Sequence, residues 1–205
     1  EIKAVYIIWN EPPEEYNIST DREKITVGDG FLHSLTELSE LSDTVTVENP
    51  RGGEICDIYF FKDMSLPDFV QRWEQPCRKA DILAFPAHAD DEFLMFGGTI
   101  PYYAKELDLR VQVVYMTTHW EEQPRPHELL DGLWAAGVEN YPVFGIIHDI
   151  PYQPIFTLSE AAALYDFDEV LEWFTEQLRR FKPSVVISHD LNGEYGHAAH
   201  KLAAK

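Results

Sequence analysis

Two short polar segments carry the residue types that metal-dependent hydrolysis needs. The first is His88-Ala89-Asp90-Asp91-Glu92, where four ionisable side chains occupy five positions. Such a group is costly to hold together unless a cation offsets the repulsion between its carboxylates. The segment therefore predicts a divalent metal site. The alternative is that the carboxylates only cap the helix that follows and complement its dipole.

The second polar segment runs from His189 to His200 and ends in His197-Ala198-Ala199-His200. Histidines three positions apart lie on one face of a helix, so the two imidazoles would point the same way. A pair of this kind also arises by chance on solvated helix faces. Its position directly after an apolar, strand-like run favours the functional interpretation.

Alternating strand and helix patterns place the two polar segments together. The predicted strands are 82–86, 111–116, 142–147 and 184–188, and the predicted helices are 93–107, 126–137 and 166–181. This alternation is typical of a parallel sheet covered on both faces, with ligands beyond the carboxyl ends of the strands. Both polar segments follow strands of that sheet. They are expected to meet at one edge and to offer His and Asp ligands that suit catalytic zinc, with one position left open for water.

The first 65 residues show a different sequence pattern, without the alternation of strands and helices. Short β-rich runs at 4–9, 25–28, 44–48 and 56–61 are separated by turn-forming stretches, and residues 66–80 are expected to form a connecting helix. The start of the chain resembles part of the discoidin-like carbohydrate-binding β-sandwiches, which would imply a secreted enzyme that acts on glycans. The favoured alternative is a β-rich extension of the catalytic domain, which leaves both a cytoplasmic and a secreted location open.

Composition excludes several classes of partner. The 36 acidic and 16 basic residues give a formal charge of −20, which repels nucleic acid and anionic membrane surfaces. A neutral or cationic small molecule or a glycan remains compatible. The sequence contains no run of 18 or more apolar residues, so no membrane span is predicted. Cys56 and Cys77 are too few for a thiolate zinc site and are interpreted as two buried thiols. Nothing in the pattern indicates an oligomeric state.

Residues 81–205, which contain these motifs, resemble the LmbE-like, or PIG-L, family of zinc-dependent de-N-acetylases. The segments that carry the resemblance are 88–92, 197–200, Gly97-Gly98, the helix beginning at Arg125-Pro126-His127-Glu128-Leu129, Ala136-Gly137-Val138, and the stretch from Phe144-Gly145 to Asp149. The resemblance implies an α/β fold with a Rossmann-like parallel sheet flanked by helices over residues 66–205. It also implies a hydrolase that removes the acetyl group from an N-acetylglucosamine-type sugar or glycoconjugate.

The resemblance also implies a role for each residue of the site. His88, Asp91 and His200 would be the metal ligands, and Asp90 the base that takes a proton from the metal-bound water as it attacks the amide carbonyl. His197 would steady the oxyanion or protonate the leaving amine. Zinc is the expected ion, although mixed His and Asp ligands also accept Fe²⁺ and other divalent metals.

Arg125, His119 and Trp120 are candidate substrate contacts. Arg125 would anchor a hydroxyl or phosphate of the substrate, with an ion pair to an acidic neighbour as the alternative. His119 and Trp120 would hydrogen-bond and stack on a sugar, with ordinary loop packing as the alternative.

The chain departs from the family pattern at two places. Ala89 replaces a proline, and Ala198-Ala199 replaces a Pro-Asp pair, so a carboxylate beside His197 is lost and Asp190 or Glu194 becomes the candidate replacement. The chain also stops five residues after His200, which predicts a C-terminally incomplete domain. These departures motivate a second hypothesis, a non-catalytic glycan-binding protein that keeps the fold and the metal.

Overall fold

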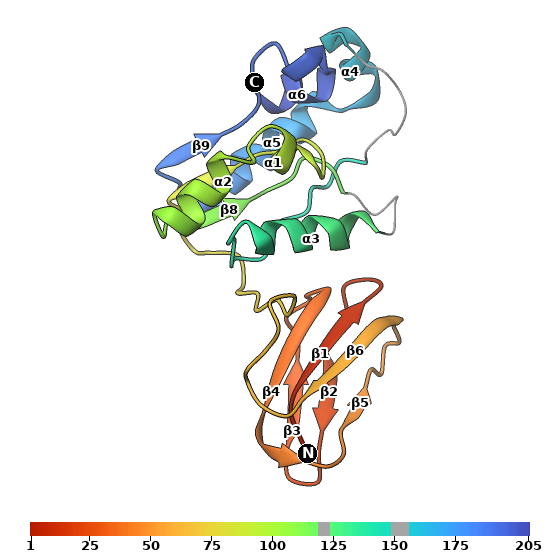
Figure 1. Ribbon diagram of the computed structural model, residues 1–205. Coiled ribbons are helices and arrows are strands. Elements are labelled where there is room, and N and C mark those ends of the chain that lie inside the picture. The colour runs from red at the N-terminus through yellow and green to blue at the C-terminus, as the bar shows by residue number, and fades with distance from the viewer. Residues whose placement is uncertain (119–123, 149–155) are drawn as a thin grey trace. The chain divides into compact units, whose positions relative to one another are not determined.

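The computed structural model of the protein describes residues 1–118, 124–148 and 156–205. These residues form two compact units, Glu1–Gln75 and Pro76–Lys205. Their helices and strands are labelled in Figure 1. The division follows Gln75, whereas the pattern placed it after residue 65.

The first unit is built from strands that pair into two antiparallel sheets. The strands are β1 (Ile2–Trp9), β2 (Tyr16–Ser19), β3 (Lys24–Val27), β4 (His33–Ser42), β5 (Thr46–Glu48) and β6 (Ile55–Phe61). The strand orders are β4-β1-β6 and β3-β2-β5. The Trp9 ring from β1 lies 4.8 Å from the Tyr16 ring of β2, and both side chains are buried, so the two sheets share a core. Cys56 on β6 is exposed, which corrects the expectation of a buried thiol, whereas Cys77 is buried.

No helix forms over residues 66–80, where the pattern predicted a connecting helix. Instead, Gln71 N donates a hydrogen bond to the Tyr6 hydroxyl at 3.3 Å, and the Trp73 indole donates to the Gln71 side-chain oxygen at 2.7 Å. These bonds hold the segment against β1 in an irregular conformation. Pro67 and Pro76 also lack the N–H that a helix interior requires. Tertiary contacts therefore override the local helical pattern.

The second unit contains a three-stranded parallel sheet. Its strands are β7 (Ile82–Ala84), β8 (Val111–Val113) and β9 (Val185–Ile187), in the order β8-β7-β9. The central strand β7 is buried at every position, as expected of an apolar strand in a parallel sheet. Residues 142–147, predicted as a fourth strand, make only two isolated parallel bridges, Val114 to Val143 and Thr117 to Ile147. The fold of this unit is mixed α/β.

Helices connect the strands of the second unit. They are α1 (Asp91–Leu94), α2 (Thr99–Pro101), the π-helical turn η1 (Tyr102–Glu106), α3 (Arg125–Ala135), α4 (Leu158–Leu164), α5 (Phe167–Phe181), the short 3₁₀ turn η2 (Glu194–Gly196) and α6 (Ala198–Ala203). Helix α5 packs on the sheet, since the Phe174 ring lies 4.5 Å from the Phe85 ring. Among residues 1–118, 124–148 and 156–205, none of the helices has the length and apolar character that a membrane span requires.

The helix predicted over residues 93–107 is broken into short pieces at Gly97. A Cβ atom added there would lie 2.2 Å from the carbonyl oxygen of Phe93, so only glycine allows the chain to approach itself this closely. The break ends α1 after one turn, close to the polar loop that precedes it. Figure 1 shows α1 and α2 as separate short helices.

Candidate metal and catalytic site

The loop after β7 is anchored by its neighbours on both sides. Ala87 N donates to His189 Nε2 at 3.0 Å, and the Thr117 hydroxyl donates to the Ala87 carbonyl oxygen at 2.9 Å. Thr117 follows β8 and His189 follows β9, so the ends of all three parallel strands meet here. This is the edge at which the sequence placed the site.

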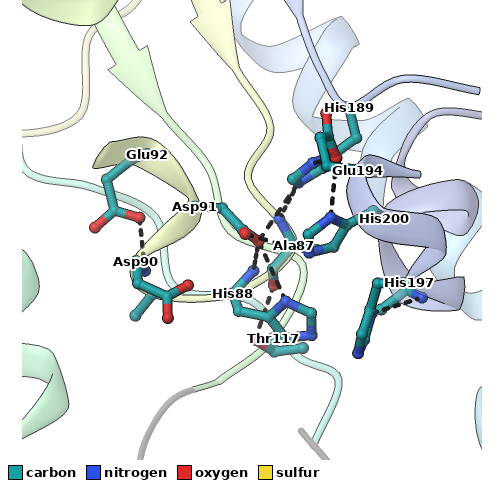
Figure 2. A network of polar contacts seen from close by, with 12 residues as sticks. Ala87, His88, Asp90, Asp91, Glu92, Thr117, His189, Glu194, His197 and His200 are labelled. Atoms are coloured by element: carbon teal, nitrogen blue, oxygen red, sulfur yellow. Dashed lines mark hydrogen bonds and ion pairs between the residues drawn. The ribbon is translucent and has the colours of Figure 1, made fainter. Parts of the chain in front are cut away.

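Asp91 lies at the centre of the cluster and is 1% exposed. Its Oδ2 accepts a hydrogen bond from His88 N at 2.9 Å and lies 3.2 Å from His88 Nδ1. Its Oδ1 lies 3.2 Å from His200 Nε2. Figure 2 shows the Asp91 carboxylate between these two imidazoles, with His189 above it. The two polar segments are thus brought together, as predicted.

The capping alternative for the acidic loop does not describe this geometry. Asp90 occupies the N-cap position of α1, but its side chain makes no capping hydrogen bond. The Asp91 carboxylate is turned to histidines instead. Burial opposes ionisation of Asp91, but the neighbouring imidazoles of His189, His200 and His88 outweigh burial and hold the pKa of the carboxyl well below its usual range. The cluster therefore has an ionised carboxylate at its centre.

Two further members of the cluster are His189 and Glu194. Glu194 Oε2 lies 2.7 Å from His189 Nδ1 and 2.9 Å from His200 Nδ1. Sequence reasoning left His189 out of the site, although its position directly after a predicted strand was a usable signal. Glu194 was considered only as support for His197, whereas its carboxylate contacts the other two histidines (Figure 2).

A buried nitrogen of His200 fits a metal ligand. His200 is fully buried, and its Nε2 has no hydrogen-bond partner among the residues that the structure describes. Because Nδ1 donates to the Glu194 carboxylate, Nε2 of the neutral imidazole carries a lone pair. This nitrogen lies 3.2 Å from Asp91 Oδ1, but the pair does not have the geometry of a hydrogen bond. Two electron-rich atoms facing each other in a buried site are what a cation would stabilise.

The described residues offer two overlapping groups of metal-ligating atoms. One is His88, His197 and His200, and the other is Asp91, His189 and His200. His189 is the weaker candidate, because its Nε2 already accepts the Ala87 N–H. A set of imidazole nitrogens and a carboxylate oxygen suits zinc and other transition metals.

His197 lies beside the cluster on the first turn of α6. Its Nδ1 accepts a hydrogen bond from Ala199 N at 3.3 Å, and its ring centroid lies 5.1 Å from that of His88. Burial, together with the neighbouring imidazoles, lowers the pKa of His197 to about 4. At neutral pH the ring is therefore uncharged, with its proton on Nε2. Ala198 and Ala199 are fully buried in an apolar cluster, where a carboxylate at 199 would be costly.

Asp90 is held in a strained backbone conformation at the edge of the site. Its φ of 154° and ψ of −24° are unfavourable for a residue with a Cβ. The buried Glu92 supports this conformation, since its Oε2 accepts the Asp90 N–H at 3.0 Å. Burial, and then the negative charge of Asp91, raise the pKa of Asp90. Burial also raises the pKa of Glu92, to about 7.

Arg125, at the start of α3, is directed to the same loop. Its Nη1 donates to the Ala89 carbonyl oxygen at 2.6 Å and to Asp90 Oδ2 at 3.4 Å. The contact with an acidic neighbour, weighed as an alternative from the sequence, is therefore present. His119 and Trp120 lie outside the described residues.

Comparison with known protein families matches the part of the chain that forms this site. A profile of the PIG-L family, described as GlcNAc-PI de-N-acetylase, matches residues 83–205, which include both polar segments. The chain belongs to the PIG-L family. The resemblance inferred from the motifs is thereby confirmed.

Two relatives of this PIG-L family member are deacetylases by name. A 1D-myo-inositol 2-acetamido-2-deoxy-alpha-D-glucopyranoside deacetylase of Gordonia bronchialis is 31% identical over 156 residues, covering 59% of this chain and 53% of the relative. A deacetylase 1 of the same description from Saccharopolyspora erythraea is 29% identical over 150 residues, covering 58% and 49%. The chain thus spans about half the length of the curated relatives it matches.

Proposed function

We propose that this PIG-L family protein is a zinc-dependent hydrolase that removes the acetyl group from an N-acetylglucosamine-type sugar or glycoconjugate. The observation that carries the proposal is the buried His200 Nε2, which faces Asp91 Oδ1 at 3.2 Å and has no hydrogen-bond partner among the described residues. A Rossmann-like arrangement of the second unit is part of the proposal. It is supported by the parallel order β8-β7-β9 and by a site at the carboxyl ends of those strands.

His88, Asp91 and His200 are the proposed ligands. Asp91 lies between the two imidazoles, 3.2 Å from a nitrogen of each. Two nitrogens and one oxygen leave a coordination position open, which is typical of catalytic rather than structural zinc sites. A bound zinc would supply Lewis-acid chemistry, polarising a carbonyl group and lowering the pKa of water.

Asp90 is the proposed general base. It is adjacent in sequence to a ligand, yet its carboxylate contacts Arg125 and not the histidines drawn in Figure 2, which leaves it available for proton transfer. Its raised pKa makes the carboxylate a stronger base than an exposed aspartate. It would accept a proton from the attacking water and could return that proton to the amine nitrogen when the carbon–nitrogen bond breaks.

His197 is proposed to donate a hydrogen bond to the carbonyl oxygen of the substrate as negative charge develops there. Its Nδ1 is an acceptor for Ala199 N, so the neutral ring presents an Nε2–H. A pKa of about 4 favours this role over that of a protonated acid at neutral pH.

The substrate class rests on the relatives. Both are named for removing the acetyl group of an acetamido-glucopyranoside of inositol. A sugar amide of this kind is the proposed substrate here, and His119 and Trp120 remain proposed contacts for its ring.

An acetate-release assay tests the function. Zinc-loaded protein is incubated with a panel that includes N-acetylglucosamine, its inositol glycoside and its phosphatidylinositol glycoside, and acetate and free amine are both quantified. We expect equimolar acetate and amine from at least one compound, and loss of both products after chelation of the metal. Binding of the glycans without release of acetate from any of them would favour the non-catalytic alternative.

Arg125→Gln provides a prediction about the base. The guanidinium donates to the Ala89 carbonyl and the Asp90 carboxylate, and neither of these groups is a proposed ligand. Its loss is expected to slow acetate release about fivefold, corresponding to about 1 kcal/mol for a partly exposed interaction. Zinc affinity, measured by calorimetric titration, should be unchanged. An equal loss of zinc affinity would place Arg125 in the metal site instead.

A further inference from the structure

Glu194 uses its two carboxylate oxygens for different partners. Oε1 accepts the backbone N–H of Asp190 at 3.0 Å, which closes the loop after β9. Oε2 lies 2.7 Å from His189 Nδ1 and 2.9 Å from His200 Nδ1. Oε1 alone closes the loop, so the two contacts of Oε2 with the histidines have a role beyond loop closure.

These contacts determine which nitrogens of the two imidazoles carry protons. An ionised carboxylate only accepts hydrogen bonds, so Nδ1 of His189 and Nδ1 of His200 must both be protonated. In the neutral rings Nε2 is then left with a lone pair. His200 directs this lone pair toward Asp91, and His189 directs it to the N–H of Ala87 at 3.0 Å.

His189 extends the effect of Glu194 to the other half of the site. It is buried and stacks on His200 with ring centroids 4.1 Å apart and planes 23° apart. Its bond to Ala87 N fixes the residue that directly precedes His88. One carboxylate therefore orients a proposed ligand on α6 and, through His189, the loop that carries the other two.

We propose that Glu194 is a positioning residue of the metal site, setting the Nδ1–H form of both His189 and His200 so that His200 Nε2 is available to zinc. The proposal rests on the proposed function in that it takes His200 as a ligand. A carboxylate behind a metal-binding histidine fixes its orientation and increases its basicity. Here one carboxylate serves two histidines, of which only one is a proposed ligand.

Glu194→Gln is a sharp test because the amide has the same shape as the carboxylate but only one acceptor oxygen. If that oxygen faces the histidines, the NH₂ group opposes the N–H of Asp190; if the amide is reversed, the NH₂ group opposes Nδ1 of both rings. Asp190→Asn is the matched control. It removes one negative charge from the same loop, and the asparagine oxygen can still accept the Asn192 N–H that Asp190 Oδ1 accepts at 2.8 Å.

The experiment combines zinc titration with nitrogen NMR of the histidine rings. Zinc alone is titrated calorimetrically into metal-free wild type, Glu194→Gln and Asp190→Asn. We expect affinity to fall about 10- to 100-fold in Glu194→Gln and to be unchanged in the control. Long-range proton–nitrogen spectra of metal-free wild type should show the Nδ1–H form for His189 and His200, and this form should be lost in Glu194→Gln.

The outcomes separate this inference from the proposed function. If wild type binds zinc but Glu194→Gln binds it equally well, Glu194 is not a positioning residue and the function stands. The Nε2–H form in wild type would also overturn the inference, whether or not the variant folds. If wild type itself binds no zinc, the proposed function fails first.

Discussion

Asp90→Asn is expected to lower the rate of acetate release by about 100- to 10,000-fold, the contribution that a general base typically makes. Asparagine keeps the size of the side chain but cannot accept a proton from water. Zinc affinity should stay close to that of wild type, because Asp90 lies outside the histidine cluster and pairs with Arg125. The rate is measured on the best substrate of the panel, and the metal content by elemental analysis.

Asp190→Asn controls for the loss of one negative charge, since this aspartate is exposed and its Oδ1 accepts the Asn192 N–H instead of contacting His197, which the sequence had suggested. Its acetate release should match that of wild type. If Asp90→Asn retains more than about a tenth of the wild-type rate, Asp90 is not the base. Full loss of zinc in this variant would instead make Asp90 a ligand.

His200→Ala is expected to weaken zinc binding by more than about 100-fold, because a directly bonded ligand contributes more than the outer partners, whose loss costs 10- to 100-fold. The variant removes the buried Nε2, which lacks a hydrogen-bond partner in the described parts of the chain, together with the Nδ1–H bonded to Glu194. Acetate release should disappear at zinc concentrations that saturate wild type. Calorimetric titration of metal-free protein measures the effect.

His148→Ala is the matched control, since it removes an exposed imidazole that belongs to neither group of metal-ligating residues. Its zinc affinity should equal that of wild type. Because His200 is buried, the folding of His200→Ala is checked by amide hydrogen exchange of β7 and β8. A folded His200→Ala variant with wild-type zinc affinity would remove His200 from the ligand set.

The parallel sheet was the most predictable part of the fold. Strands β7, β8 and β9 lie inside the runs 82–86, 111–116 and 184–188, and the central strand β7 is apolar and buried at successive positions, as expected in a parallel sheet. The run 142–147 has the same character but forms only isolated bridges. Whether an apolar run pairs along its length depends on its neighbours in space, which the local pattern does not contain.

Two features of the first unit were not predicted from the sequence, for the same physical reason. β4 carries leucines at 35, 38 and 41, a spacing of three that is more typical of a helix than of a strand. Its pairing with β1 decides the outcome. Residues 66–80 have a helical pattern, yet hydrogen bonds of Gln71 to Tyr6 and Trp73 hold them in an irregular conformation.

The part of the site that could be predicted is the part where the strand pattern and the ligand-type side chains indicated the same place. His88, Asp91 and His200 follow strands of one sheet, and the structure brings them together. The sequence did not reveal that Glu194 would bond His189 and His200 rather than His197. Tyr195, beside Glu194, has a left-handed backbone with a φ of 46°, and no residue preference signals such a turn at a tyrosine.

The proposed zinc site is tested most directly by anomalous diffraction from crystals of the wild-type protein grown with zinc. Data collected on both sides of the zinc absorption edge locate the ion without reference to activity. We expect one strong peak within about 2.0–2.3 Å of a nitrogen of His88, an oxygen of Asp91 and Nε2 of His200. No peak at this cluster, or a peak bonded to His189 instead of His88, would contradict the proposed site.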